Sequence, residues 1–255
     1  MTPFEAVFQR KSIRAYKNDP VPESVLDKIQ NFDGELIPMY PFVKMQTRLF
    51  KSEEFGRMLN PLMVKAPYYL AIYAQPLEGY RYNAGNMMEQ IALYLHSQGV
   101  GTCFVGMMKP PKETADPEGM EFVIMLALGI PKGELNRDAK KASRTPLDKI
   151  CVYKQEPLKA TRQLVEAARL APSSVNSQPW KFVVYKNRIH IFVSEKKGYS
   201  RLQEPWADIN MGIMMSHILL AAEEYWIDIA MTKAENLAEK TVPNYQYIGS
   251  VMVKP

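Results

Sequence analysis

The sequence predicts an α+β protein built from two similar halves, and three observations support this prediction. Two long helices repeat the same apolar spacing, with Met87 of the first matching Met214 of the second, 127 residues later. A buried strand follows each helix, at Phe122–Leu128 and again at Tyr247–Val253. Finally, the ten residues Ala171–Trp180 join a helix to a strand through a dense polar turn.

The repeat extends beyond hydrophobic spacing. Asn83 matches Asn210, Gly85 matches Gly212, and the Met87-Met88 pair recurs. Coincidence between two amphipathic helices explains a shared stripe more easily than it explains these identities. The stripe positions are Ala84, Met87, Met88, Ile91, Ala92 and Leu95 in the first half and Met211, Met214, Met215, Ile218, Leu219 and Ala222 in the second. We therefore predict one compact unit, 1–255, made of two repeats, 1–150 and 151–255.

Composition and charge fit a globular protein that binds a small anion. The chain has 255 residues, of which 47% are hydrophobic and 23% charged, enough for one large domain or two small ones. The net charge of +5 and the pI of about 9.0 suit an anionic ligand or cofactor without requiring nucleic acid. Cys103 and Cys151 have neither a metal-binding spacing nor a disulfide framework, which favours a reducing compartment.

Two observations predict a cytoplasmic protein with no membrane partner. The first ten residues lack the apolar core of a signal peptide. The most apolar helix, near Met211 to Ala222, is interrupted by polar residues and too short to span a bilayer.

Two polar segments are candidates for ligand binding. The turn contains Ser173, Ser174, Asn176 and Gln178 between two prolines; its simplest interpretation is a helix-to-strand turn that satisfies its own backbone. Near the N-terminus, an extended Arg10–Arg14 segment would place the guanidinium groups of Arg10 and Arg14 on the same side of the chain as the hydroxyl of Ser12. Such a set can bind a phosphate. By itself, such a short basic run is more often solvated surface.

Taken together, these segments resemble the nitroreductase family, the FMN-dependent NAD(P)H oxidoreductases. Ala171–Trp180 resembles the flavin-binding turn, and Arg10–Arg14 resembles the family's Arg-x-Ser-x-Arg element. The run Gly99–Gly106 is similar to the family's Gly-Leu-Gly-Thr-Cys-Trp-Ile-Gly segment. The alternative is a helix that ends at glycine and continues into a core strand, which would have the same pattern. Arg144 resembles the phosphate-binding Lys or Arg that lies late in the sequences of the family. An equally good interpretation is that it belongs to a solvated linker.

The order of these motifs departs from the family. The turn should follow the first helix, but Phe32–Pro41 lacks its serines, Asn and Gln, and the turn appears only at Pro172. Conversely, the segment 148–153 of the second half has no Arg-x-Ser-x-Arg. Nitroreductases are homodimers that bind each FMN between subunits, so this chain resembles two fused subunits with one complete and one degenerate site.

The resemblance implies a fold and an oligomeric state. We expect an α+β, nitroreductase-like three-layer α/β/α fold with two pseudo-symmetric halves. Each half would hold a mostly antiparallel sheet, and the halves would pack through long central helices. A monomer acting as a pseudo-dimer is the expected state, and a homodimer is possible.

The resemblance also implies roles for individual residues. Arg10 and Ser12 would contact the FMN phosphate with Lys11 nearby, and Arg14 would contact the N1/O2 edge of the flavin. Amides of the Gly99–Gly106 run would face flavin N5 and O4. No side chain is expected to act as acid or base, and no metal is expected. The remaining cofactor-binding residues would be Val105, Gly106, Arg144, Pro172, Ser173, Ser174, Asn176 and Gln178.

The implied reaction passes hydride from NADH or NADPH through FMN to a small acceptor such as a nitroaromatic, quinone or enone. The alternative is a non-enzymatic or degenerate flavin-binding protein that acts as a sensor or store. Nucleic-acid binding has little support, because cations are scattered among acids. We interpret His96, His190 and His217 as surface or core residues, since they share no metal spacing, and Cys103 as a small buried residue.

Overall fold

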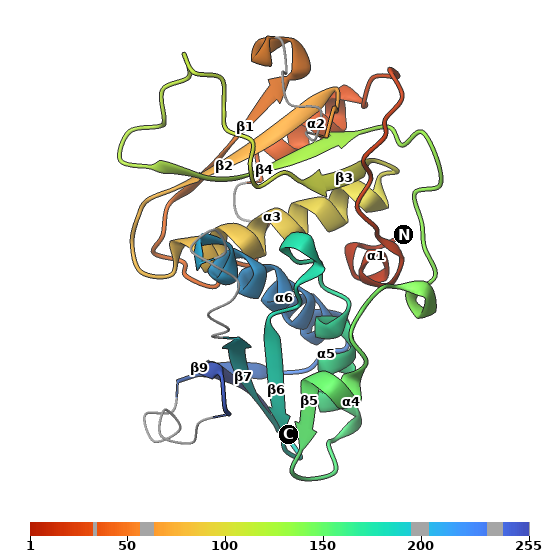
Figure 1. The fold of residues 1–255 in the computed structure, drawn as a ribbon, viewed down its shortest axis with the longest axis vertical. Helices are drawn as coiled ribbons and strands as arrows, with labels where there is room; N and C mark the ends of the chain where they lie inside the picture. Colours follow the sequence, from red (N-terminus) through yellow and green to blue (C-terminus); the bar gives the residue numbers. More distant parts are fainter. Residues whose placement is uncertain (33–34, 57–63, 195–203, 234–241, 255) are drawn as a thin grey trace. The chain divides into compact units, whose positions relative to one another are not determined.

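Two sheets of buried apolar strands, one in each half of the chain, form the framework of the protein (Figure 1). The computed structural model describes residues 1–255 except 33–34, 57–63, 195–203, 234–241 and 255. The chain divides into unit 1, Met1–Lys141, and unit 2, Ala142–Pro255.

Unit 1 is organised around an antiparallel sheet with the strand order β1-β2-β4-β3. Helix α3 packs against β2, β3 and β4 on one face, visible in yellow in Figure 1. The elements of unit 1 are α1 (Pro3–Gln9), α2 (Glu23–Gln30), β1 (Met45–Lys51), the 3₁₀ helix η1 (Ser52–Phe55), β2 (Tyr68–Ala74), α3 (Tyr80–Ser97), β3 (Gly101–Phe104), β4 (Glu121–Gly129) and the 3₁₀ helix η2 (Ala139–Lys141).

Strand β2 lies in the middle of this sheet because both of its faces are apolar. It pairs with β1 on one side and β4 on the other, and six of its seven residues are buried. Alternate residues, including Tyr69 and Tyr73, join a cluster with Phe50 and Met125 that Tyr16 and Phe55 partly cover. The other set, including Leu70, lies on the opposite face of the strand.

Unit 2 contains a sheet with the order β5-β6-β7-β9-β8, in which only the β5–β6 pair is parallel. Helices α5 and α6 pack against each other. The elements of unit 2 are α4 (Leu147–Ile150), β5 (Cys151–Tyr153), α5 (Lys159–Arg169), the 3₁₀ turn η3 (Ser174–Asn176), β6 (Trp180–Val184), β7 (Arg188–Ser194), α6 (Glu204–Glu224), β8 (Ile229–Thr232) and β9 (Tyr245–Val253).

Most predicted elements are present, with two informative differences. Residues 42–50 alternate loosely and predict a strand, but β1 begins only at Met45, because Val43 N–H closes a turn onto Tyr40 O (3.1 Å) after Pro41. The sequence also predicts a short helix at 52–59. The structure has a 3₁₀ helix at Ser52–Phe55, and the end of the predicted range lies outside the described residues. Helix α6 has 21 residues, yet no helix in the described part of the chain is long and apolar enough to cross a membrane.

The two sheets share more than their strand order. Without β5, the order β6-β7-β9-β8 reproduces β1-β2-β4-β3. The pairing of β2 with β4 shifts by one residue between Ile72 and Tyr73, which leaves Val123 as the extra residue. The pairing of β7 with β9 shifts in the same way between Ile191 and Phe192. This common irregularity supports the prediction of an internal duplication.

The ends of the two long helices are also equivalent. After α3, Val100 N–H donates to Leu95 O (2.9 Å); after α6, Ile227 N–H donates to Ala222 O (2.8 Å). This bond requires a left-handed residue just before the donor. Gly99 fills that position in unit 1 with φ 83°, whereas Trp226 fills it in unit 2 with φ 54° and is 95% exposed. Trp226 therefore carries backbone strain that Gly99 avoids.

We predict that Trp226→Gly stabilises the protein. Relief of the left-handed strain is worth about 1–2 kcal/mol, and the added freedom of glycine in the unfolded chain offsets about 0.5–1 kcal/mol of it. Urea denaturation followed by circular dichroism would measure the difference. The matched control is Gly99→Ala, which should lower the free energy of unfolding by about 1 kcal/mol or more. A less stable Trp226→Gly protein would contradict the strain argument.

Candidate functional site

The Arg10–Arg14 segment extends the sheet of unit 1 beyond β3. Ile13 N–H donates to Thr102 O (2.8 Å), and Ser12 forms a parallel bridge with Thr102. The segment can approach this closely because residue 101 is glycine: a Cβ there would lie 2.7 Å from Cγ1 of Ile13. The predicted extended conformation is present, and it lies beside the start of the Gly99–Gly106 run.

Arg10 is held tightly at the end of α1. Its N–H donates to Ala6 O (2.8 Å), and its carbonyl accepts a hydrogen bond from Nε of Arg137 (2.5 Å). The side chain is almost wholly buried, with Nε 3.8 Å from Oε1 of Glu89 on α3. Among the described residues, Nε and Nη2 of Arg10 have no hydrogen-bond partner. A buried guanidinium with unused donors fits an anionic acceptor.

The other predicted residues of the Arg10–Arg14 segment differ in how exposed their side chains are. Lys11 and Ser12 are half-buried, and Arg14 is exposed. Burial raises the pKa of the Cys103 thiol, with a partial opposing effect from Arg14, Arg10 and a hydrogen bond to Ser12. Cys103 is thus the small buried residue that the sequence predicts, and its raised pKa keeps the thiol protonated.

Val105 and Gly106 follow β3. The Val105 N–H donates to Met125 O (2.9 Å) and so belongs to the sheet of unit 1. This hydrogen bond was not anticipated for a residue expected to offer its amide to flavin. Gly106 lies half-buried in the following turn.

In unit 2 the polar side chains of the turn are used to hold the turn itself. Ser173 Oγ accepts a hydrogen bond from Gln178 N–H (2.8 Å), and Gln178 Oε1 accepts one from Thr145 N–H (2.7 Å). Gln178 Nε2 donates to Asn176 O (3.1 Å). The conformation of the turn is therefore over-determined by its own side chains, as its simplest interpretation predicted.

This turn is also strained. Val175, Asn176 and Gln178 all have positive φ, at 46°, 56° and 45°. A β-branched residue rarely adopts this conformation, yet Val175 does so and leaves its side chain 78% exposed. Strain of this kind persists where the surrounding hydrogen bonds enforce it, and it concentrates at ligand-binding turns. Pro172, just before the turn, is buried.

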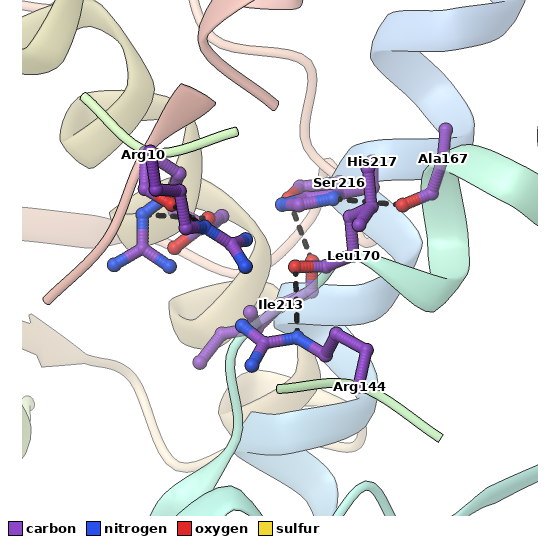
Figure 2. A network of polar contacts seen from close by, with 9 residues as sticks. Arg10, Arg144, Ala167, Leu170, Ile213, Ser216 and His217 are labelled. Atoms are coloured by element: carbon purple, nitrogen blue, oxygen red, sulfur yellow. Dashed lines mark hydrogen bonds and ion pairs between the residues drawn. The ribbon is translucent and has the colours of Figure 1, made fainter. Parts of the chain in front are cut away.

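Arg144 fixes the turn from the side. Its Nε donates to Leu170 O (3.2 Å) and its Nη1 to Asn176 Oδ1 (2.9 Å), and Figure 2 shows the first of these bonds. Asn176 Nδ2 in turn donates to Ser143 O (3.0 Å). The structure thus brings Arg144 together with the turn, which the sequence did not predict.

Asn210, on α6, contacts the candidate turn, and this contact was not predicted from the sequence. Its Oδ1 accepts a hydrogen bond from Ser174 N–H (2.9 Å), and its Nδ2 donates to Ser174 Oγ (3.1 Å). Asn83, its match in the repeat, accepts from Met39 N–H (2.9 Å) and Tyr40 N–H (3.2 Å) in unit 1. The exact Asn83–Asn210 match was the signal for this role, because each of the two equivalent asparagines bonds to a loop of its own unit.

The histidines belong to the core. Nδ1 of His217 lies 3.0 Å from Ala167 O (Figure 2), and Nδ1 of His190 lies 2.7 Å from Ser250 Oγ. Burial, together with the charge of Arg10, lowers the pKa of His96 to about 4. The described residues contain no group of three His, Cys, Asp or Glu side chains that could hold a metal ion.

Comparison with solved structures shows the fold. A protein from Thermotoga maritima, named as a putative nitroreductase, matches with a TM-score of 0.67 and 22% identity over 99% of this chain and 93% of its own. A nitroreductase-family protein from Clostridium novyi matches 52% of this chain and 88% of its own, with 20% identity and a TM-score of 0.44. One from Desulfovibrio desulfuricans, named as a complex with FMN, matches 61% of this chain and 97% of its own, with 17% identity and a TM-score of 0.45.

The family comparison goes further. No curated protein matches this chain. A family model described as "Putative TM nitroreductase" matches residues 3–222, and this span includes every predicted site residue from Arg10 to Gln178. With the nitroreductase-like α+β fold also shown, the chain belongs to this nitroreductase family.

Proposed function

We propose that the protein is an FMN-dependent oxidoreductase that transfers hydride from NADH or NADPH to a small acceptor such as a nitroaromatic, quinone or enone. The observation that carries the proposal is the buried guanidinium of Arg10, whose Nε and Nη2 have no hydrogen-bond partner among the described residues. These donors fit the phosphate of FMN. When bound, FMN supplies the hydride chemistry, and the protein supplies binding and orientation.

In unit 1, we assign the phosphate to Arg10 and Ser12, with Lys11 adjacent. The exposed guanidinium of Arg14 is proposed to face the N1/O2 edge of the flavin, where a fixed cation stabilises the negative charge of the reduced ring. Gly106 is proposed to offer its amide to the ring. Val105 keeps a packing role, because its own amide is bonded to Met125.

In unit 2, the turn residues are proposed to contribute in two ways. Asn176, Gln178 and Arg144 shape the turn through the hydrogen bonds they already make. The hydroxyl of Ser173 accepts a hydrogen bond from Gln178 N–H and that of Ser174 accepts one from Asn210 Nδ2, and each can still donate one to the ring or ribityl chain of FMN. Pro172 would pack beside them. That one FMN is held by both sets of residues remains a prediction, as does the monomeric pseudo-dimer.

The decisive experiment is a visible spectrum of the purified chain with FMN, before and after anaerobic addition of NADH or NADPH. We expect one FMN per chain, bleached by at least one of the two donors and reoxidised by a quinone or nitroaromatic. Bound flavin that neither donor bleaches would favour the alternative, a sensor or store. No flavin binding at excess FMN would contradict the proposal.

We predict that Arg14→Gln lowers the reduction potential of bound FMN. Loss of the cation removes stabilisation of the anionic reduced flavin, by up to about 30 mV for this two-electron couple. Anaerobic titration with a reference dye would measure the shift, and Arg14→Lys, which keeps the charge, is the control. Equal potentials in wild type and Arg14→Gln would show that Arg14 does not face the ring.

We predict that Asn210→Ala weakens FMN binding by about tenfold, because the Ser174 amide and hydroxyl lose their partner and the strained turn relaxes. Fluorescence titration with FMN would measure the affinity. Asn83→Ala is the matched control, since it removes the equivalent bonds in unit 1, where the turn residues are missing. It should lower thermal stability and leave FMN affinity unchanged. An equal loss of affinity in both variants would point to a general effect on folding.

A further inference from the structure

We propose that Glu89, in the middle of α3, is the positioning residue that presents Arg10 to a phosphate monoester. This inference rests on the proposed FMN function and deepens it, because it explains how the phosphate contact is prepared before the ligand arrives.

The backbone of Arg10 is fixed independently of Glu89. The Arg10 N–H caps α1 through Ala6 O, and the loop at Asn136 and Arg137 bonds to the chain on both sides of the Arg10 peptide. What remains to be set is the direction of the long, flexible side chain. Glu89 is the carboxylate paired with it.

Because both side chains are buried, Arg10 and Glu89 stabilise each other as an ion pair. The Glu89 side chain has 0% exposure and the Arg10 side chain 2%. Each buried charge requires the other, since an isolated charge is strongly disfavoured away from water. Glu89 nevertheless leaves Nε and Nη2 of Arg10 without hydrogen bonds, so the guanidinium is oriented and still able to donate.

The charge balance around Arg10 favours an anion. Arg10 pairs with Glu89, and Nε of Arg137 donates to the carbonyl of Arg10. Burial lowers the pKa of His96 to about 4, so that His96 is neutral near pH 7, and the charges of Arg10, Arg137 and Glu89 also act on it. These three charged groups carry two positive charges and one negative charge, so a negatively charged ligand beside Arg10 is electrostatically favoured.

The repeat supplies an internal comparison. By the spacing that aligns Asn83 with Asn210, the position of Glu89 corresponds to Ser216 on α6. Unit 2 has no arginine motif at 148–153, and there Ser216 Oγ simply donates to Ile213 O (2.8 Å) within its own helix (Figure 2). The carboxylate is therefore present in the half that carries Arg10 and absent from the half that does not. This pattern links Glu89 to Arg10 rather than to the architecture of the helix.

The test compares the affinities for FMN and for riboflavin, which lacks the phosphate. Wild type should bind FMN more tightly, and Glu89→Gln should reduce FMN affinity by about ten- to a hundredfold while riboflavin affinity stays within about threefold. A merely structural role would weaken both ligands together. Ser216→Ala, at the equivalent position of unit 2, should leave the preference for FMN unchanged.

Glu89→Gln leaves Arg10 as an unpaired buried charge, and this variant can fail to fold for that reason. A second comparison does not depend on the single Glu89→Gln variant. Arg10→Gln and the double variant Arg10→Gln/Glu89→Gln remove that buried charge. If Glu89 acts through Arg10, the double variant loses no more FMN preference than Arg10→Gln alone.

The outcomes separate the two proposals. A Glu89→Gln protein with the wild-type preference for FMN, or a further loss of preference in the double variant, overturns the role of Glu89 and leaves flavin binding standing. A wild-type chain that binds neither FMN nor riboflavin overturns both.

Discussion

The buried polar face of α3 is the constraint on which unit 1 depends. Asn83, Asn86, Glu89 and Gln90 are all buried on this helix, and each needs a partner. Three of them bind the backbone of the 37–40 loop, through Ile37, Met39 and Tyr40. Glu89 instead pairs with Arg10. One helix therefore positions both a loop and the phosphate-binding candidate, and it does so because polar groups away from water must be satisfied.

Unit 2 retains part of this arrangement and replaces the rest. Asn210 still holds the loop that precedes β6, but Ile213 and Ser216 stand at the positions of Asn86 and Glu89. The loop compensates with its own polar residues, which close the turn and enforce positive φ at Val175. The two units thus use equivalent helices to hold different loops.

The strength of the local pattern decided which features were predictable from the sequence. The apolar run Tyr68–Ala74 predicts a buried strand, and β2 has these bounds. The stripe of α3 is equally clear, and Leu164, Val165 and Ala168 predict the apolar face of α5. The role of Gly101 was not predicted, since a glycine required for the approach of Ile13 looks like any other glycine until the two chain segments meet.

The sequence by itself determined the fold class, the repeated helices and the motifs that identify the family, because periodicity and short motifs are local properties of the chain. Only the tertiary structure decided which side chains meet: that Glu89 faces Arg10, that Asn210 holds Ser174, and that Arg144 braces Asn176. These partners are far apart in sequence, and they are paired because folding buries their polar groups together and leaves them few other acceptors or donors.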